Sequence, residues 1–138
     1  MKTTSFAVVT AEGIVESAEA VSVTIPTAAG EITVLPEHIP VVSVLVPGVL
    51  TVRTEKDEKH VAVSGGFVQV AKDSVTVLAD GAERAEDIDE RQAEAARKRA
   101  EEVMAGKREK EEIAEASAEL QRSLARLRAV ELVKSRRS

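Results

Sequence analysis

Residues 1–81 alternate apolar and polar side chains with a period of two, which is the pattern of strands that have one buried face. In the run AVSVTI, at residues 20–25, three β-branched aliphatic side chains alternate with Ser22 and Thr24. Similar runs are LTVR, HVAV, FVQV and VTVL. Turn-forming glycines, prolines and charged clusters separate these runs closely. The pattern therefore predicts a small antiparallel β-sandwich or barrel rather than a βαβ fold.

The segment 30–52 is rich in valine yet contains Pro36, Pro40 and Pro47. Proline has no amide hydrogen to donate, so it cannot lie in a central strand without removing a ladder hydrogen bond. We therefore expect several short strands separated by bends, with a rigid loop between Pro36 and Pro40.

Beyond residue 81 the apolar positions recur at steps of three and four, which is the period of a helix. Asp87, with Glu90 three residues later, predicts the start of a first helix, and Gly106 predicts its end. A second helix is predicted over 109–134. The expected apolar stripes are Ala93, Ala96, Ala100 and Val103 on the first helix, and Ile113, Ala116, Leu120, Leu124, Leu127 and Val130 on the second.

The turn between these helices is short, so they are expected to form an antiparallel hairpin. The chain thus divides into a β-sandwich domain, residues 1–81, and a helical hairpin, residues 82–138. The first part contains 15 Asp, Glu, Lys and Arg residues and the second contains 28. An alanine-rich stripe buries little apolar area, so the hairpin is a candidate moving part.

Composition excludes several classes of protein. The chain has no cysteine, so it has neither a disulfide framework nor a thiolate zinc site. A net charge of -5 and only two aromatic residues, Phe6 and Phe67, argue against nucleic-acid binding. No apolar run approaches the roughly 20 residues that cross a bilayer, and the N-terminus lacks the pattern of a signal peptide. A soluble protein that stays where it is made is expected.

Few residues carry recognisable chemistry. The sequence has no GxxxxGK, HExxH or GxSxG motif, and SGG at 64–66 is interpreted as a turn. The only histidines, His38 and His60, are far apart and have no cysteine partner, so no metal site is predicted. These observations give no physical ground for calling the chain an enzyme.

Four charged residues, Glu115, Glu119, Arg122 and Arg126, line one face of the predicted second helix. One interpretation is a row of surface ion pairs, each worth a few tenths of a kcal/mol. The other is that two guanidiniums on adjacent turns form a bidentate clamp for phosphate. Spacing alone favours the first.

Several ordered motifs, GEI and LPEHIP, then PGVL, SGG, VTVLAD, EDIDE and ASAELQRSLARLRAVEL, extend over nearly the whole chain. In this order and spacing they resemble the epsilon subunit of the F-type ATP synthase. The fold implied by the resemblance is an N-terminal antiparallel β-sandwich followed by a C-terminal two-helix hairpin. It agrees with the fold predicted from periodicity.

The resemblance implies a non-catalytic rotor subunit that helps couple proton translocation to ATP synthesis. Its implied partners are the gamma subunit, the membrane c-ring and, when the hairpin is extended, the alpha/beta catalytic head. It places Glu31 toward the c-ring, and His38 and Ser43 toward gamma. It also implies a peripheral position at the cytoplasmic face of the plasma membrane, with the membrane reached only through the complex. The extended hairpin would restrain ATP hydrolysis.

In some members of this family ATP holds the hairpin against the sandwich, and no other cofactor is required. The motif residues present in this chain are Ile88, Asp89, Ala93, Arg122 and Arg126. Gln92 replaces the motif arginine, and Arg91 lies about 100° away around the helix. Because glutamine brings no charge, weak or absent ATP binding is expected.

Periodicity alone fits two other classes of protein equally well. One is a soluble adaptor or holdase built from a sandwich and a coiled hairpin, and the other is a small-ligand sensor. Neither would have a role in ATP synthesis. Only the ordered motifs favour the rotor subunit over these alternatives.

Overall fold

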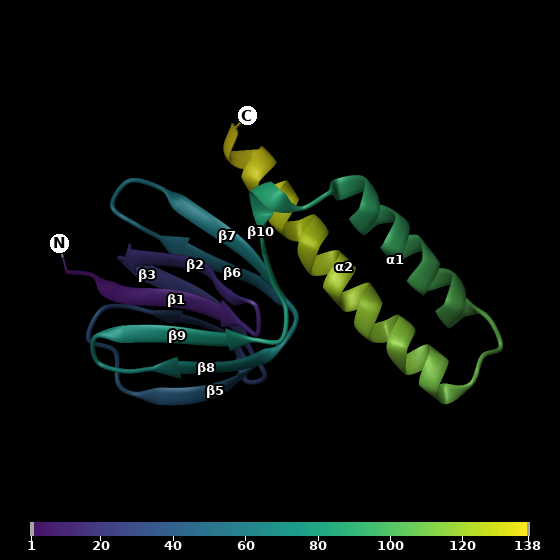
Figure 1. Ribbon diagram of the computed structural model, residues 1–138, viewed down its shortest axis with the longest axis horizontal. Coiled ribbons are helices and arrows are strands. Elements are labelled where there is room, and N and C mark those ends of the chain that lie inside the picture. The colour runs from purple at the N-terminus through teal and green to yellow at the C-terminus, as the bar shows by residue number, and fades with distance from the viewer. Residues whose placement is uncertain (1, 138) are drawn as a thin grey trace.

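The structure is a computed structural model that describes the backbone of residues 2–137 and the side chains of residues 2–135. Ten strands come first and two long helices follow (Figure 1). The elements are β1 Thr4–Thr10, β2 Gly13–Ala20, β3 Ser22–Thr27, β4 Gly30–Val34, β5 Val41–Leu45, β6 Gly48–Arg53, β7 Glu58–Val63, β8 Gly66–Val70, β9 Ser74–Ala79, β10 Ala82–Arg84, the 3₁₀ turn η1 Ala85–Asp87, α1 Glu90–Ala105 and α2 Lys110–Arg137.

The strands form one continuous sheet in the order β10-β7-β6-β3-β5-β8-β9-β1-β2, with β4 paired to β3. The sheet folds back on itself into a barrel-like sandwich (Figure 1). All strand pairs are antiparallel except β1 with β9. The predicted β-sandwich is therefore confirmed. Strand β10 extends the sheet as far as Arg84, beyond the change in composition at residue 81.

The alternating runs supply the sandwich core. Leu50 and Val52 are completely buried, whereas Arg53 is exposed, as a half-buried strand requires. Val21 departs from the expected pattern, because it lies between β2 and β3 and is only partly buried. The core is otherwise filled by valine, leucine, isoleucine, Phe6 and two alanines, Ala20 and Ala79.

Strand β7 breaks the alternation, because all four residues of HVAV, 60–63, are buried. Val61 and Val63 belong to the sandwich core. His60 and Ala62 occupy the opposite face of the strand, which helix α2 covers. Both faces of β7 are thus removed from water over residues 60–63.

The three prolines of segment 30–52 separate short strands, as predicted, whereas Pro26 lies inside β3. Pro36 and Pro40 lie in the connection between β4 and β5, and Pro47 precedes β6. Within the first connection Glu37 adopts a positive φ of 65°, which is uncommon for a residue other than glycine. The backbone of this loop is therefore held in one specific bend.

The start of the hairpin differs from the prediction. Asp89, not Asp87, is the N-cap of α1, and its carboxylate accepts a hydrogen bond from the Gln92 amide at 3.1 Å. Asp87 instead closes η1, so its predicted pairing with Glu90 is wrong. Asp87 and Asp89 lie two residues apart, and either can cap a helix, so the sequence alone did not distinguish them. Gly106 ends α1 as expected, with an extended backbone.

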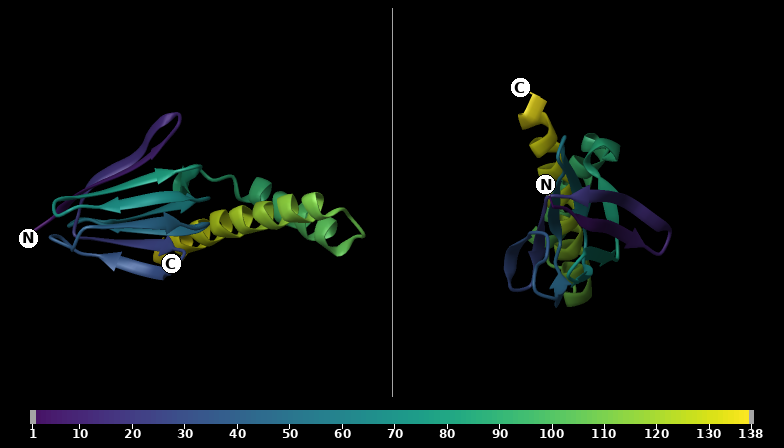
Figure 2. Two further views of the ribbon diagram at one scale, coloured as in Figure 1. Left: turned by 90° about the horizontal axis from the view of Figure 1, so that it is seen from below. Right: turned by 90° about the vertical axis from the view of Figure 1, so that its left-hand side faces the viewer.

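The two helices lie antiparallel, side by side, and the hairpin projects from one end of the sandwich (Figure 2). Helix α2 contacts β6, β7 and η1. Its buried face toward the sandwich contains Ala125 and Ala129, which pack against Ala62 and Ala85. Leu124, predicted in the apolar stripe, is 49% exposed. Within the described part of the chain, neither helix has the length and apolar character needed to span a bilayer.

Candidate functional site

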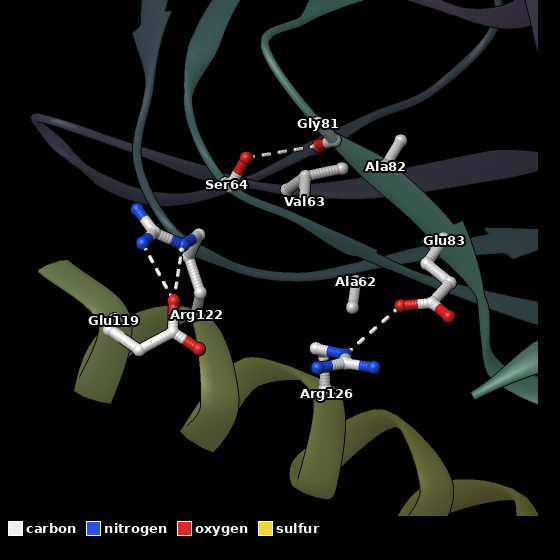
Figure 3. A pocket seen from close by; sticks show the side chains of 9 residues that line it. All are labelled: Ala62, Val63, Ser64, Gly81, Ala82, Glu83, Glu119, Arg122 and Arg126. Carbon is white, nitrogen blue, oxygen red and sulfur yellow. Dashed lines mark hydrogen bonds and ion pairs between the residues drawn. The ribbon is translucent and has the colours of Figure 1, made fainter. Parts of the chain in front are cut away.

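A cavity of about 270 Å³ lies between the sandwich and α2. Figure 3 shows the side chains around it, which come from the end of β7, from β10 and its preceding turn, and from α2. The lining residues are Ala62, Val63, Ser64, Gly81, Ala82, Glu83, Glu119, Arg122 and Arg126. The two arginines that the sequence singled out are therefore brought into one cavity.

Arg122 is paired within its own helix. Its Nη2 lies 2.7 Å and its Nε 3.2 Å from Oε2 of Glu119, which is one turn earlier on α2 (Figure 3). This is one of the ion pairs predicted along the helix face, whereas Arg126 of the predicted row pairs outside the helix. Both side chains are more than a third exposed, so the pair adds only a few tenths of a kcal/mol to helix stability.

Arg126 is paired across the interface instead. Its Nε donates to Oε1 of Glu83 at 3.0 Å, which joins α2 to β10 of the sheet (Figure 3). The Arg126 side chain is 23% exposed, so this ion pair is less screened than the Glu119–Arg122 pair. It is the polar connection between the sandwich and the hairpin at this cavity.

A phosphate clamp requires two guanidiniums with free donors that converge on one anion. Arg122 and Arg126 lie on successive turns of α2 and face the same cavity. Each is already bonded to a carboxylate, one from Glu119 and one from Glu83. An incoming phosphate would have to displace these carboxylates or approach the remaining guanidinium N–H groups.

The other predicted nucleotide residues do not line this cavity. Ile88 is the C-cap that follows η1, and it packs beside the alanine cluster under α2. Asp89 caps α1, and Ala93 is fully buried. Gln92 is exposed and contributes its backbone amide to the cap. In this conformation Ile88, Asp89 and Ala93 have structural roles at the start of the hairpin.

Glu83 was not identified from the sequence. Its partner Arg126 is 43 residues away, so no local spacing reveals the pair. Neighbouring Ser64 fixes the cavity wall, because its amide donates to the Gly81 carbonyl at 3.0 Å. In the sequence, Glu83 is one acidic residue within the three-residue segment that forms β10, and nothing nearby distinguishes it.

The residues expected to contact other subunits lie away from this cavity. Glu31 is exposed on β4. His38 lies in the proline-bounded loop, where its Nδ1 is 2.7 Å from the carbonyl oxygen of Ile39. Ser43 is partly buried, on the face of β5 opposite to the exposed Val42 and Val44.

An apolar row crosses the outer face of the sheet next to Ser43. The ladders join Val44 to Phe67, Phe67 to Leu78, Leu78 to Val9 and Val9 to Ile14, across five neighbouring strands. Four of these side chains are 49–69% exposed. Sequence periodicity did not separate this row from the core, because both faces carry aliphatic residues.

No three or more His, Asp or Glu side chains gather into a metal site anywhere in the part of the chain that the structure describes. Of the titratable groups, Arg84 has its pKa raised by a hydrogen bond to Asp87, and it also faces Glu86 and Glu16. This ion-pair cluster joins β2, β10 and η1 where the sandwich meets the hairpin.

A barrel-like β-sandwich with a helical hairpin packed against one end, and with Arg122 and Arg126 at the junction, defines a class of two-part proteins. Two family models match this chain. ATP synthase, Delta/Epsilon chain, beta-sandwich domain matches residues 3–85, and ATP synthase, Delta/Epsilon chain, long alpha-helix domain matches residues 86–131. The chain belongs to the ATP synthase delta/epsilon chain family.

Curated relatives agree over most of their length. The chain is 44% identical to the ATP synthase epsilon chain of Moorella thermoacetica over 130 residues, which cover 94% of this chain and 97% of the relative. It is 47% identical to that of Nitratidesulfovibrio vulgaris over 121 residues, which cover 88% and 90%. The predicted resemblance is therefore confirmed, and the chain is a non-catalytic ATP synthase subunit.

Solved structures agree on the fold. A chain in the Euglena gracilis mitochondrial ATP synthase, in a structure of OSCP, F1 and c-ring, has a TM-score of 0.71 at 22% identity, covering 100% of this chain and 83% of that chain. A chain of the Tetrahymena thermophila mitochondrial enzyme, from its central stalk and c-ring, gives 0.58 at 14% identity, covering 94% and 97%. The family replaces the alternatives of an unrelated adaptor or ligand sensor.

Proposed function

We propose that the sandwich of this chain binds the gamma subunit and the c-ring, and thereby helps couple proton translocation to ATP synthesis. In this proposal the hairpin alternates between the docked position and an extended one that reaches the alpha/beta head and restrains ATP hydrolysis. Family membership and the epsilon-chain relatives support the assignment. The complex would be attached peripherally at the cytoplasmic face of the plasma membrane.

The main support for a gamma contact is the exposed apolar row that crosses the outer face of the sheet. Phe67, Val44 and Leu78 are each about half exposed and adjoin one another through the ladders. Val42, on the same face of β5, is 68% exposed. Contiguous exposed apolar side chains of this extent are typical of a surface that another protein covers. The family resemblance names the gamma subunit as a partner, and we assign it to this surface.

The proline-bounded loop supports a second contact. Ile39 is 80% exposed at its tip, beside His38, and the backbone bend at Glu37 is fixed between two prolines. A rigid loop loses little conformational entropy when it binds. We therefore assign His38 to the gamma contact and Glu31, on the neighbouring strand β4, to the c-ring contact. Ser43 would contribute only if its side chain turned from the core-facing side of β5.

The hairpin is suited to move because its contact with the sandwich is small. The buried apolar side chains there are alanines, and the polar connection at the cavity is the Arg126–Glu83 pair. A two-state element of this kind shifts when any ligand prefers one state. The extended state would expose the alanine face of α2 for a new partner.

Regulation by ATP is proposed to be weak in this chain. Both clamp arginines are bonded to carboxylates, and Gln92 supplies no charge at the motif position. Calorimetric titration of the full chain with ATP should show little heat at micromolar concentrations, and Gln92→Arg should bind more tightly. Tight, magnesium-independent binding by the unaltered chain would contradict the proposal.

Two experiments on the assembled ATP synthase test the two halves of the proposal. Deletion of residues 89–138 removes the hairpin but keeps β10 in the sheet, and it should raise the rate of ATP hydrolysis. An unchanged rate would confine the function of the chain to the sandwich.

Phe67→Ser should reduce co-purification of gamma, whereas Leu124→Ser, at a similarly exposed site on α2, should not. Equal retention of gamma by both variants would remove the apolar row from the contact.

A further inference from the structure

His60 is buried beneath the hairpin. It is only 4% exposed, on the face of β7 that α2 covers. Its Nδ1 lies 3.0 Å from Oγ1 of Thr51, its ladder partner on β6. The imidazole also borders a cavity of about 430 Å³ between the sheet and α2, through which protons can reach it without unfolding of the sandwich.

The charged groups around this cavity come from two sources. The sandwich contributes Glu31 from β4, Arg53 from β6 and Glu58 from β7. Arg53 and Glu58 form an ion pair at 3.3 Å. These three groups belong to the same rigid body as His60, so they surround it whether or not the hairpin is docked.

Helix α2 contributes a different set. It brings Ala125, Leu132 and Arg128 to the cavity, which are two apolar side chains and one cation. Arg128 is itself paired with Glu131 at 3.6 Å on the exposed side of the helix. Docking therefore adds apolar cover and a guanidinium to the cavity, and none of the described α2 residues that line it is acidic.

We propose that protonation of His60 releases the hairpin from the sandwich. An imidazolium beneath α2 would be shielded from water, which disfavours its charge. The Arg128 guanidinium, which lines the same cavity, adds a smaller repulsion because it is paired with Glu131. Undocking removes the cover and the cation while leaving the sandwich carboxylates in place. The proton thus binds the undocked state more tightly than the docked state, which is the requirement for a ligand that shifts a two-state equilibrium.

The direction of the pH dependence follows from this difference. Because docking disfavours the imidazolium, the docked state is favoured above the pKa of the undocked imidazole, for which the ordinary histidine value is about 6.5. Below it the docking equilibrium weakens by at most about tenfold per pH unit, the limit for one proton. The release is a property of this chain alone, and its consequence for ATP hydrolysis rests on the proposed function.

The test uses the full-length chain, which has no native cysteine. A pair of cysteines at exposed positions, Lys56→Cys beside β7 and Gln121→Cys on α2, carries a donor and an acceptor dye. Energy transfer between the dyes should change between pH 7.5 and 5.5 as the hairpin leaves. His60→Gln should remove this change and remain docked, whereas His38→Gln, in the exposed loop, should keep it.

A second measurement does not depend on any variant at His60. The two histidine signals are followed by NMR over the same pH range, and His38→Gln assigns them. The midpoint for His60 should coincide with that of the energy-transfer change. An unaltered chain that stays docked at pH 5.5, a change that persists in His60→Gln, or an energy-transfer midpoint unrelated to the titration of His60 would each overturn the proposal. Each of these results leaves the gamma and c-ring contacts untouched.

Discussion

The sandwich and the hairpin of this chain are stabilised by different amounts of apolar burial. Ile25, Leu50 and Val52 are completely buried in the sandwich, and each such side chain contributes about 1.5–3 kcal/mol on burial. At the hairpin contact the buried side chains include Ala125 and Ala129, and a methyl group contributes only about 0.8 kcal/mol. This difference in apolar burial supports the proposal that the hairpin can leave the sandwich without unfolding it.

The polar contacts follow the same division. Lys134 pairs with Glu90 at 2.6 Å, so this bond holds α2 to α1 and moves with the hairpin. The Arg126–Glu83 pair is the one at the cavity that undocking must break. A partly exposed ion pair is worth at most about 1 kcal/mol, which is small against the whole sandwich core.

The largest expected effect is at the sandwich core. Leu50→Ala should lower the free energy of unfolding by about 2–5 kcal/mol, because it leaves a cavity in a fully buried site. The matched change Leu124→Ala, at a side chain 49% exposed on α2, should alter it by less than about 1 kcal/mol. Urea unfolding followed by circular dichroism measures both. Equal losses would show that Leu124 contributes as much buried packing as Leu50, and would contradict the weak apolar contact of the hairpin.

A second change tests how tightly the sandwich backbone is packed. Gly66 and Gly13 both have φ near +127°, so alanine is strained at either position, by about 1–3 kcal/mol. A Cβ at Gly66 would also collide with the carbonyl oxygen of Leu78, whereas Gly13 faces open space. Gly66→Ala should therefore lower the melting temperature more than Gly13→Ala. If the two melting temperatures fall equally, close packing at Gly66 is not the cause.

A larger side chain in the hairpin contact should weaken docking without destabilising the sandwich. Ala129 is fully buried in α2, against the sandwich, so Ala129→Leu should weaken docking by about 1–3 kcal/mol. Ala114→Leu, at an exposed position on the same helix, is the control. Limited proteolysis should cleave the hairpin faster in the first variant and leave the sandwich intact. Loss of both regions at one rate would argue against independent docking.

The smallest expected effect is electrostatic and lies on α1. A hydrogen bond from Arg97 lowers the pKa of Glu94. A carboxyl with a lowered pKa stabilises the folded state above its ordinary pKa, near pH 4.5, and loses this contribution as the pH falls. Because the site is exposed, the effect is small and screened by salt. Glu94→Gln should flatten the dependence of hairpin stability on pH between 5 and 3, as helical circular dichroism would report.

Much of the fold could be predicted from the sequence because periodicity reports burial directly. Leu50 and Val52 alternate with polar neighbours, and they are buried as expected. Periodicity does not predict burial where a second layer covers the outer face of a strand. His60 and Ala62 are buried for that reason, and no pattern within β7 reveals the helix that covers them.

The docking face of α2 was missed because alanine gives a weak hydrophobic signal. The leucines set the predicted stripe, yet Leu124 is half exposed while Ala129 is fully buried. At the candidate site, spacing identified Arg122 and Arg126 on one helix face. It could not identify Glu83, because a partner 43 residues away is set by the tertiary fold.

In the proposed motion the hairpin opens from a sandwich that stays folded. Native-state hydrogen exchange of the full-length chain, measured residue by residue, tests it most directly. Amides of α1 and α2 should exchange through an opening that costs several kcal/mol less than the opening of β6 and β8, and Ala129→Leu should lower only the hairpin value. A single opening free energy shared by the helices and the sheet would contradict the account.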